Sequence, residues 1–324
     1  MTLWLPVFML RRYENISNLH LIVSIAQIVL LVISLLITYY TVYRISLSNI
    51  FNFNIKSIFV FNLLSYITMF AGKFLILPVL LDIHTIESSA VLTIRNILEI
   101  LEVQPTFEIN LFIIGGVLIW THVTIITGSI LTLSIERTFA SYFINDYERV
   151  PRKWISILLV SSNIIFTILV TSVTILCIRP FFEIVCFNII AQLAAIMVFL
   201  SNRFYTINIV ERLKNNSNYS LATRFQTVEN LRAEKMIARL YFFGGIGFLT
   251  CFITFYAFYS NRWTKYQIYF LCLIESIVLL YPLLVCPIFL ISLRKVPMNN
   301  VSPQNANFRE EADVYFKHLT NSWR

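Results

Sequence analysis

The stretch 21-LIVSIAQIVLLVISLLITYYTVY-43 decides the fold, because it runs for 23 residues without a charged side chain. An α-helix needs about 20 consecutive apolar residues to cross the hydrocarbon core of a bilayer. The whole chain has the same character, since hydrophobic residues make up 58% of its 324 residues and charged residues only 13%. A soluble protein carries roughly 25% charged residues and could not bury this much apolar surface. The chain is therefore predicted to be an integral membrane protein.

Six more stretches of similar length follow the first one. The predicted spans are residues 21–43, 57–81, 111–135, 155–178, 181–201, 240–259 and 266–293. Each is expected to be helical, because a helix pairs its backbone groups internally and an unpaired group in lipid is costly. The sequence therefore predicts an all-α bundle of seven transmembrane helices. Residues 21–293 would form the membrane domain, with an N-terminal segment at 1–20 and a tail at 294–324.

The positive charges predict the orientation of the bundle. Lys and Arg number 18 in the loops that follow the first, third and fifth spans and in the tail, but only 6 on the opposite side. Cytoplasmic loops carry an excess of these residues, so the N-terminus is expected outside and the tail in the cytoplasm. The net charge of +8 then reflects topology and not a nucleic-acid surface. Asn15 heads the outer sequon Asn15-Ile16-Ser17 and is a candidate for glycosylation.

A charged motif stands at the inner end of the third predicted span. It reads 136-ERTFASYF-143 and is followed by Asp146-Tyr147-Glu148 and Pro151-Arg152-Lys153. An acid followed by an arginine at this place resembles the inner-end motif of G-protein-coupled receptors, in which the arginine rests against a neighbouring acid and is released on activation. The dipeptide alone is weak evidence, because an ordinary helix end that meets the lipid headgroups often carries the same residues.

The longer string E-R-T-F-A-S-Y-F-x-x-D-Y-E-x-x-P-R is more specific. Together with 224-RFQ-226, Glu229-Asn230 and the tail string 311-EADVYF-316, it resembles the nematode chemoreceptors of serpentine receptor class epsilon. The resemblance covers the chain from the first helix to the last residues. It is strongest in the second inner loop and the tail, and weakest in spans one, four and six.

The resemblance implies a receptor-like heptahelical fold and a chemosensory function. It implies a receptor in the plasma membrane of a sensory neuron or its cilium, which binds a small-molecule cue and signals through a heterotrimeric G protein. The residues that it places at the G-protein-facing switch are Glu136, Arg137, Tyr142, Asp146, Tyr147 and Arg152. In the seventh span, Tyr281-Pro282 resembles the N-P-x-x-Y region of other receptors, but Tyr281 replaces the asparagine. A switch there and a structural kink both remain open.

Three charged residues lie inside predicted spans, namely Lys73, Glu183 and Glu275. A charge in a span costs at least about 2.5 kcal/mol on insertion scales, so each needs a partner. Lys73 lies eight residues from the outer end of its span and Glu275 nine from the outer end of its own. At 1.5 Å per residue both lie roughly 12 to 14 Å deep. Since these two spans are neighbours in a receptor bundle, an ion pair is expected, which either lines a ligand cavity or only joins the two helices.

Trp120 and His122 lie in the outer half of the third span and are further ligand-pocket candidates. A lone histidine on a helix is more often a core residue with its hydrogen bonds satisfied. The other histidines, His20, His84 and His318, do not share its depth, so no metal site is predicted. No H-E-x-x-H or G-x-S-x-G signature occurs. The sequence therefore predicts neither an enzyme nor a cofactor.

Two other classes of membrane protein compete with the receptor. A ligand-gated ion channel of the insect olfactory type would have the opposite orientation, so the location of the C-terminus distinguishes the two. A small-molecule transporter would show an inverted repeat and helices broken by glycine or proline in matching halves. The chain has only seven glycines and no such repeat, which disfavours a transporter.

Overall fold

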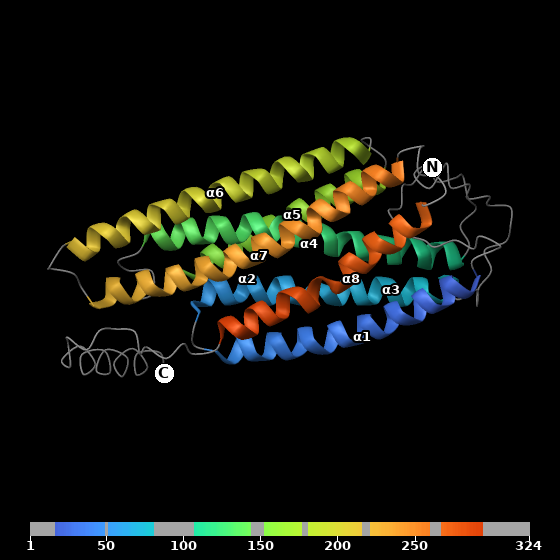
Figure 1. Ribbon diagram of the computed structural model, residues 1–324, viewed down its shortest axis with the longest axis horizontal. Helices are drawn as coiled ribbons and strands as arrows, with labels where there is room; N and C mark the ends of the chain where they lie inside the picture. Colours follow the sequence, from blue (N-terminus) through green and yellow to red (C-terminus); the bar gives the residue numbers. More distant parts are fainter. Residues whose placement is uncertain are drawn as a thin grey trace.

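The computed structural model describes residues 17–48, 51–80, 107–143, 152–176, 181–215, 221–259 and 267–293. Every regular element within these ranges is an α-helix, and the helices run side by side along the long axis of an elongated bundle (Figure 1). The fold is all-helical and receptor-like, as the sequence predicts. The N-terminal segment with Asn15 and the tail lie outside the described residues.

The described part of the chain contains eight helices. They are α1 (Ser17–Leu47), α2 (Phe53–Leu64), α3 (Tyr66–Leu80), α4 (Phe107–Tyr142), α5 (Lys153–Ile175), α6 (Phe181–Asn215), α7 (Leu221–Tyr259) and α8 (Gln267–Ser292). Two of them, α2 and α3, follow one another along a single crossing and are separated only at Ser65. The hydroxyl of Ser65 donates to the carbonyl of Asn62 at 2.7 Å, which satisfies a carbonyl at the end of α2. If α2 and α3 are taken together, the eight described helices form seven rods of the bundle.

Length and composition allow these helices to span a bilayer. Six apolar helical stretches are long enough within the described residues, and a shorter one, Ser276–Ser292, lies in α8. The helices α6 and α7 are longer than the predicted spans, since α6 continues to Asn215 and α7 begins at Leu221. Their inner halves thus project beyond the apolar stretch, as Figure 1 shows at one end of the bundle.

Two glycines allow α3 and α4 to pack closely. A Cβ atom built on Gly72 would lie 2.6 Å from the carbonyl oxygen of Gly115, and one built on Gly115 would lie 2.8 Å from that of Gly72. Small residues at such contacts let backbones approach in membrane bundles. The contact joins the outer half of α4 to α3.

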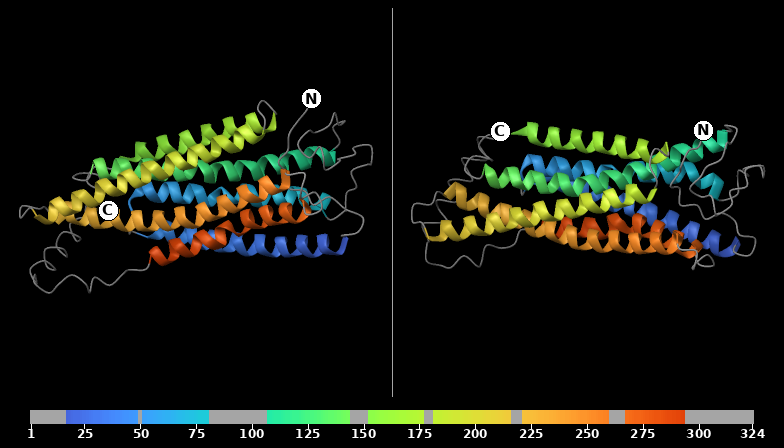
Figure 2. Two further views of the ribbon diagram at one scale, coloured as in Figure 1. Left: turned by 45° about the horizontal axis from the view of Figure 1, so that its top comes forward. Right: turned by 90° about the horizontal axis from the view of Figure 1, so that it is seen from above.

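The helix α8 lies beside α1 and α7 (Figure 2). A buried cluster joins residues of α1, α3, α4 and α8, namely Leu31, Tyr66, Met69, Ile76, Ile119 and Leu279. The helix α8 contains two prolines, Pro282 and Pro287. A proline removes one backbone hydrogen bond and displaces the carbonyls one turn before it. Leu279, three residues before Pro282, offers its carbonyl to the hydroxyl of Ser34 in α1 at 3.3 Å.

Many buried or half-buried hydroxyl groups bond to a carbonyl of their own helix, four residues earlier. Examples with their distances are Thr41 to Ile37 (2.8 Å), Thr121 to Val117 (2.7 Å), Thr132 to Gly128 (2.9 Å) and Thr174 to Val170 (2.7 Å). A buried hydroxyl without a partner costs free energy, and these bonds avoid that cost without a second helix.

Candidate functional site

Two adjacent charged residues are buried near the C-terminal end of α4. Glu136 is 0% exposed and Arg137 is 3% exposed. Arg137 donates from Nε to Oε2 of Glu136 at 2.6 Å and from Nη2 to Oε1 at 2.7 Å. Such a bidentate pair is among the stronger hydrogen-bonded contacts, and a buried charge needs one. The acid and the arginine that the motif places together are therefore paired within one helix.

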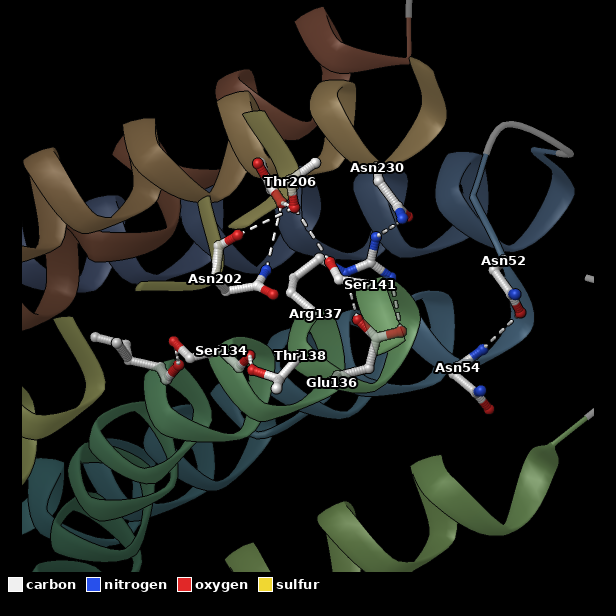
Figure 3. A network of polar contacts seen from close by, with 12 residues as sticks. Asn52, Asn54, Ser134, Glu136, Arg137, Thr138, Ser141, Asn202, Thr206 and Asn230 are labelled. Atoms are coloured by element: carbon white, nitrogen blue, oxygen red, sulfur yellow. Dashed lines mark hydrogen bonds and ion pairs between the residues drawn. The ribbon is translucent and has the colours of Figure 1, made fainter. Parts of the chain in front are cut away.

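The remaining terminal nitrogen of Arg137 joins α4 to α7. Nη1 donates to Oδ1 of Asn230 at 3.1 Å, as Figure 3 shows. This acceptor is a neutral amide, so the bond is weaker than the contact of Arg137 with Glu136. Arg137 is thus held by an acid of its own helix and reaches the neighbouring helix through a weaker hydrogen bond.

A second acid lies one helical turn further along α7. Glu234 is 2% exposed, and its Oε1 accepts from the hydroxyl of Thr206 at 2.6 Å and from Nδ2 of Asn202 at 3.3 Å. Both donors belong to α6. Among the residues that the structure describes, none hydrogen-bonds the other oxygen, Oε2. Arg137 and Arg203 supply the positive charge near this carboxylate.

One hydroxyl pair completes the network by joining α4 to α6. The hydroxyl oxygens of Ser141 and Thr206 lie 3.2 Å apart. Thr206 therefore contacts both Ser141 and Glu234, and the three helices α4, α6 and α7 meet in one buried polar cluster (Figure 3). We call Glu136, Arg137, Ser141, Asn202, Thr206, Asn230 and Glu234 the inner polar cluster.

The other predicted switch residues lie apart from this cluster or outside the described residues. Tyr142 is exposed, and its ring meets the edge of Phe143 with centroids 4.9 Å apart. The guanidinium of Arg152 stacks over the same Phe143 ring, 4.1 Å from its centroid. The structure therefore joins Tyr142 and Arg152 through Phe143. Asp146 and Tyr147 fall between the described ranges.

Of the outer candidates, His122 and Trp120 are both buried. Nδ1 of His122 lies 3.0 Å from the hydroxyl oxygen of Ser65, at the break between α2 and α3. The hydroxyl of Ser65 can donate to Asn62 and accept from Nδ1, or donate to Nδ1 itself. No described residue hydrogen-bonds the other ring nitrogen, Nε2. His122 therefore joins α4 to the break between α2 and α3.

Lys73 is 8% exposed and lies in α3, seven residues after Tyr66 and four after Met69, which belong to the buried cluster shared with Leu279 of α8. Residues of α3 and α8 thus contribute to one buried cluster. Glu275 lies four residues before Leu279, but its side chain is outside the described residues. The pair therefore stays a prediction. Glu183, the other charged residue of a span, is exposed in α6.

Sequence reasoning missed the partners of the switch on α6 and α7. Asn230 and Glu234 are four residues apart and thus share a face of their helix, as do Asn202 and Thr206 in α6. Polar residues at that spacing within an otherwise amphipathic helix were the available signal. It was not decisive, because the same spacing also suits a solvated face of a helix that extends beyond the bilayer.

The chain matches a known family over most of its length. The family described as "Sre G protein-coupled chemoreceptor" matches residues 1–297. Serpentine receptor class epsilon-31 of Caenorhabditis elegans is 25% identical over 99% of this chain and 97% of its own length. Serpentine receptor class epsilon-38 of the same organism is 24% identical over 100% and 98%, respectively. Serpentine receptor class epsilon-30 is 28% identical over 69% of each chain.

Proposed function

Because this chain belongs to the Sre family of G protein-coupled chemoreceptors, a family of multi-pass membrane receptors and not of enzymes, we propose that it binds a small-molecule cue and signals through a heterotrimeric G protein. The observation that carries the proposal is the buried pair of Glu136 and Arg137, with Arg137 linked to Asn230 of α7. This arrangement puts a releasable arginine at one end of the bundle.

The strengths of the two contacts suggest how the switch works. Arg137 makes one hydrogen bond to the neutral amide of Asn230, which contributes about 1.5 to 3 kcal/mol net because its donor is charged. It makes two to the carboxylate of Glu136, where both partners are charged, so that contact is the stronger one. Movement of α7 away from α4 therefore breaks the bond to Asn230 first and leaves the bond to Glu136 in place. The freed Nη1 is then available to a protein partner. The receptor then exchanges between a closed state, with α7 against α4, and an open state, with α7 moved away. A cue that binds the open state more tightly by only a few kcal/mol shifts the receptor toward that state.

The orientation and the location belong to the same proposal. The N-terminus lies outside, Asn15 carries a glycan, and residues 294–324 face the cytoplasm, supported by the distribution of Lys and Arg. The receptor resides in the plasma membrane of a sensory neuron or its cilium. Lys73, Trp120, His122 and Glu275 line the ligand pocket, supported by the burial of Lys73, Trp120 and His122 within the bundle.

A cell assay tests the proposal. The receptor is expressed with a C-terminal fluorescent tag in cells that report both calcium and cAMP, and a panel of odorants and small metabolites is applied with co-expressed Gα subunits of each class. We expect a cue-evoked response that needs one Gα class, together with an intracellular tag. An extracellular tag and a cue-evoked current without any G protein would instead support the ion-channel alternative.

A further inference from the structure

Tyr241 lies on α7 in the same stripe as Asn230 and Glu234, since residues 230, 234 and 241 are separated by four and seven positions. Its hydroxyl oxygen is 3.0 Å from the carbonyl oxygen of Ile130 in α4 and 3.2 Å from that of Ala195 in α6. The hydroxyl of Ser134, also in α4, is a third hydrogen-bond partner. Tyr241 therefore joins α7 to the same two helices as the inner polar cluster, at a second level of the bundle.

The protons available at this site limit how it is bonded. A tyrosine hydroxyl has one proton to donate, so the carbonyls of Ile130 and Ala195 compete for it. Ser134 can donate to Tyr241 or to Ile130, whose carbonyl oxygen is 3.0 Å away. When Ser134 donates to Tyr241, the tyrosine hydroxyl accepts that bond from α4 and donates its own hydrogen bond to the carbonyl of Ile130 in α4 or of Ala195 in α6. Each arrangement links α7 to a neighbouring helix.

Removal of this hydroxyl would leave few groups unsatisfied. The two carbonyls lie inside continuous helices and keep their own helical hydrogen bonds. Ser134 can turn to Ile130. The aromatic ring packs against Phe199 with centroids 4.9 Å apart, and a phenylalanine preserves that contact. Tyr241→Phe thus deletes the link between helices and little else.

Beyond Tyr241 the chain of α7 contains Gly244, Gly245 and Gly247. A Cβ atom built on Gly244 or Gly245 would meet nothing within 4 Å among the described residues. Glycine weakens a helix by about 1 kcal/mol relative to alanine, and glycine-containing stretches are places where helices bend. The inner half of α7, residues 230–241, therefore ends at a stretch that bends at low cost.

We infer that Tyr241 is a positioning residue of the switch, which holds residues 230–241 of α7 against α4 and α6 in the resting receptor and so limits signalling in the absence of a cue. The inference rests on the proposed function for its signalling part. Its structural part is independent, because the hydroxyl is bonded to Ser134, Ile130 and Ala195, which are not members of the inner polar cluster. Tyr241 then adds to the contacts of Asn230 with α4 and of Glu234 with α6, and all three keep α7 closed.

Hydrogen–deuterium exchange of the purified full-length receptor in lipid nanodiscs tests the structural part. In Tyr241→Phe, we expect the amides of residues 230–241 to exchange about fivefold faster, which corresponds to the loss of one net hydrogen bond. Tyr256→Phe is the matched control, because Tyr256 lies on the same helix and is 70% exposed. Ser134→Ala should act in the same direction, and its combination with Tyr241→Phe should add little. Unchanged exchange in Tyr241→Phe would overturn the inference.

Cue-independent signalling at equal surface expression tests the regulatory part. We expect Tyr241→Phe to raise it about fivefold over the wild type, with Tyr256→Phe at the wild-type level. Faster exchange with unchanged signalling, in a receptor that responds to a cue, would show a merely structural role and overturn the inference. If no variant and no cue couples to any G protein while exchange accelerates as expected, the proposed function fails and the structural role of Tyr241 stands.

Discussion

Arg137 binds the carboxylate of Glu136, its own predecessor in the chain, through two nitrogens at 2.6 and 2.7 Å. The pair neutralises itself within α4, so α7 does not have to supply a charge. Asn230 offers only an amide oxygen at 3.1 Å. The contact between α4 and α7 can therefore open without leaving a bare charge in the interior. Four predictions follow from this geometry and from the packing around it.

The first prediction concerns Asn230. Asn230→Ala removes the acceptor on α7 and leaves the ion pair of α4 intact, so the closed state loses about 1.5 kcal/mol and cue-independent signalling should rise about tenfold. The measurement is a G-protein assay at matched surface expression. Asn208→Ala is the control, because Asn208 is an exposed asparagine of α6. Equal signalling in both variants would show that Asn230 does not restrain α7.

The second prediction concerns Arg137. Arg137→Ala should reach the cell surface and lose cue-evoked signalling, because the group offered to the G protein is gone. The change also leaves Glu136 buried without its main partner, which lowers stability. The double variant Glu136→Gln with Arg137→Ala removes that acid and controls for it. Surface labelling and the cue response are measured together. A normal response in the double variant would remove Arg137 from the switch.

The third prediction concerns Lys73 and Glu275. Lys73→Met and Glu275→Gln should each lower the thermal stability of the purified receptor, by about 3 to 5 kcal/mol if the site is dry. The charge swap, Lys73→Glu with Glu275→Lys, should recover part of the loss. A double-mutant cycle isolates the coupling between the two side chains. Additive losses in that cycle would mean that each charge has another partner.

The fourth prediction concerns Gly128, where α4 meets α5. A Cβ atom there would lie 2.1 Å from Oδ1 of Asn163, and the amide of that residue donates to Ser129 at 3.1 Å. Gly128→Ala should therefore destabilise the receptor by about 1 to 3 kcal/mol, the usual cost of overpacking. Thermal unfolding measures this loss.

A glycine of α7 provides the matched control for Gly128. Gly245→Ala places the new methyl group where nothing lies within 4 Å, so it should be neutral or stabilise the helix by up to about 1 kcal/mol. Asn163→Ala should rescue Gly128→Ala, since it removes the colliding oxygen. Equal unfolding temperatures for Gly128→Ala and Gly245→Ala would contradict the close contact.

The sequence was sufficient for the architecture because long apolar stretches depend only on local composition. It also identified Glu136 and Arg137 as candidates, which the structure shows paired, while their part in signalling stays a prediction. The break at Ser65 was not predicted, because hydropathy does not distinguish one long helix from two short ones. Glu234 and Tyr241 were not predicted either. Their partners lie on α4 and α6, so their roles depend on how α7 docks, and periodicity within α7 does not encode this.

The hydroxyl groups that bond within their own helix affect how the chain is made. Helices enter the bilayer in the order of translation and associate afterwards. The hydroxyls of Thr121 and Thr132 already donate hydrogen bonds to the carbonyls of Val117 and Gly128 when their helix enters the lipid. Glu234 is different, because its donors come from α6. Since α6 is synthesised before α7, those donors are already in the bilayer when the ribosome delivers this acid, which need not wait unpaired in lipid.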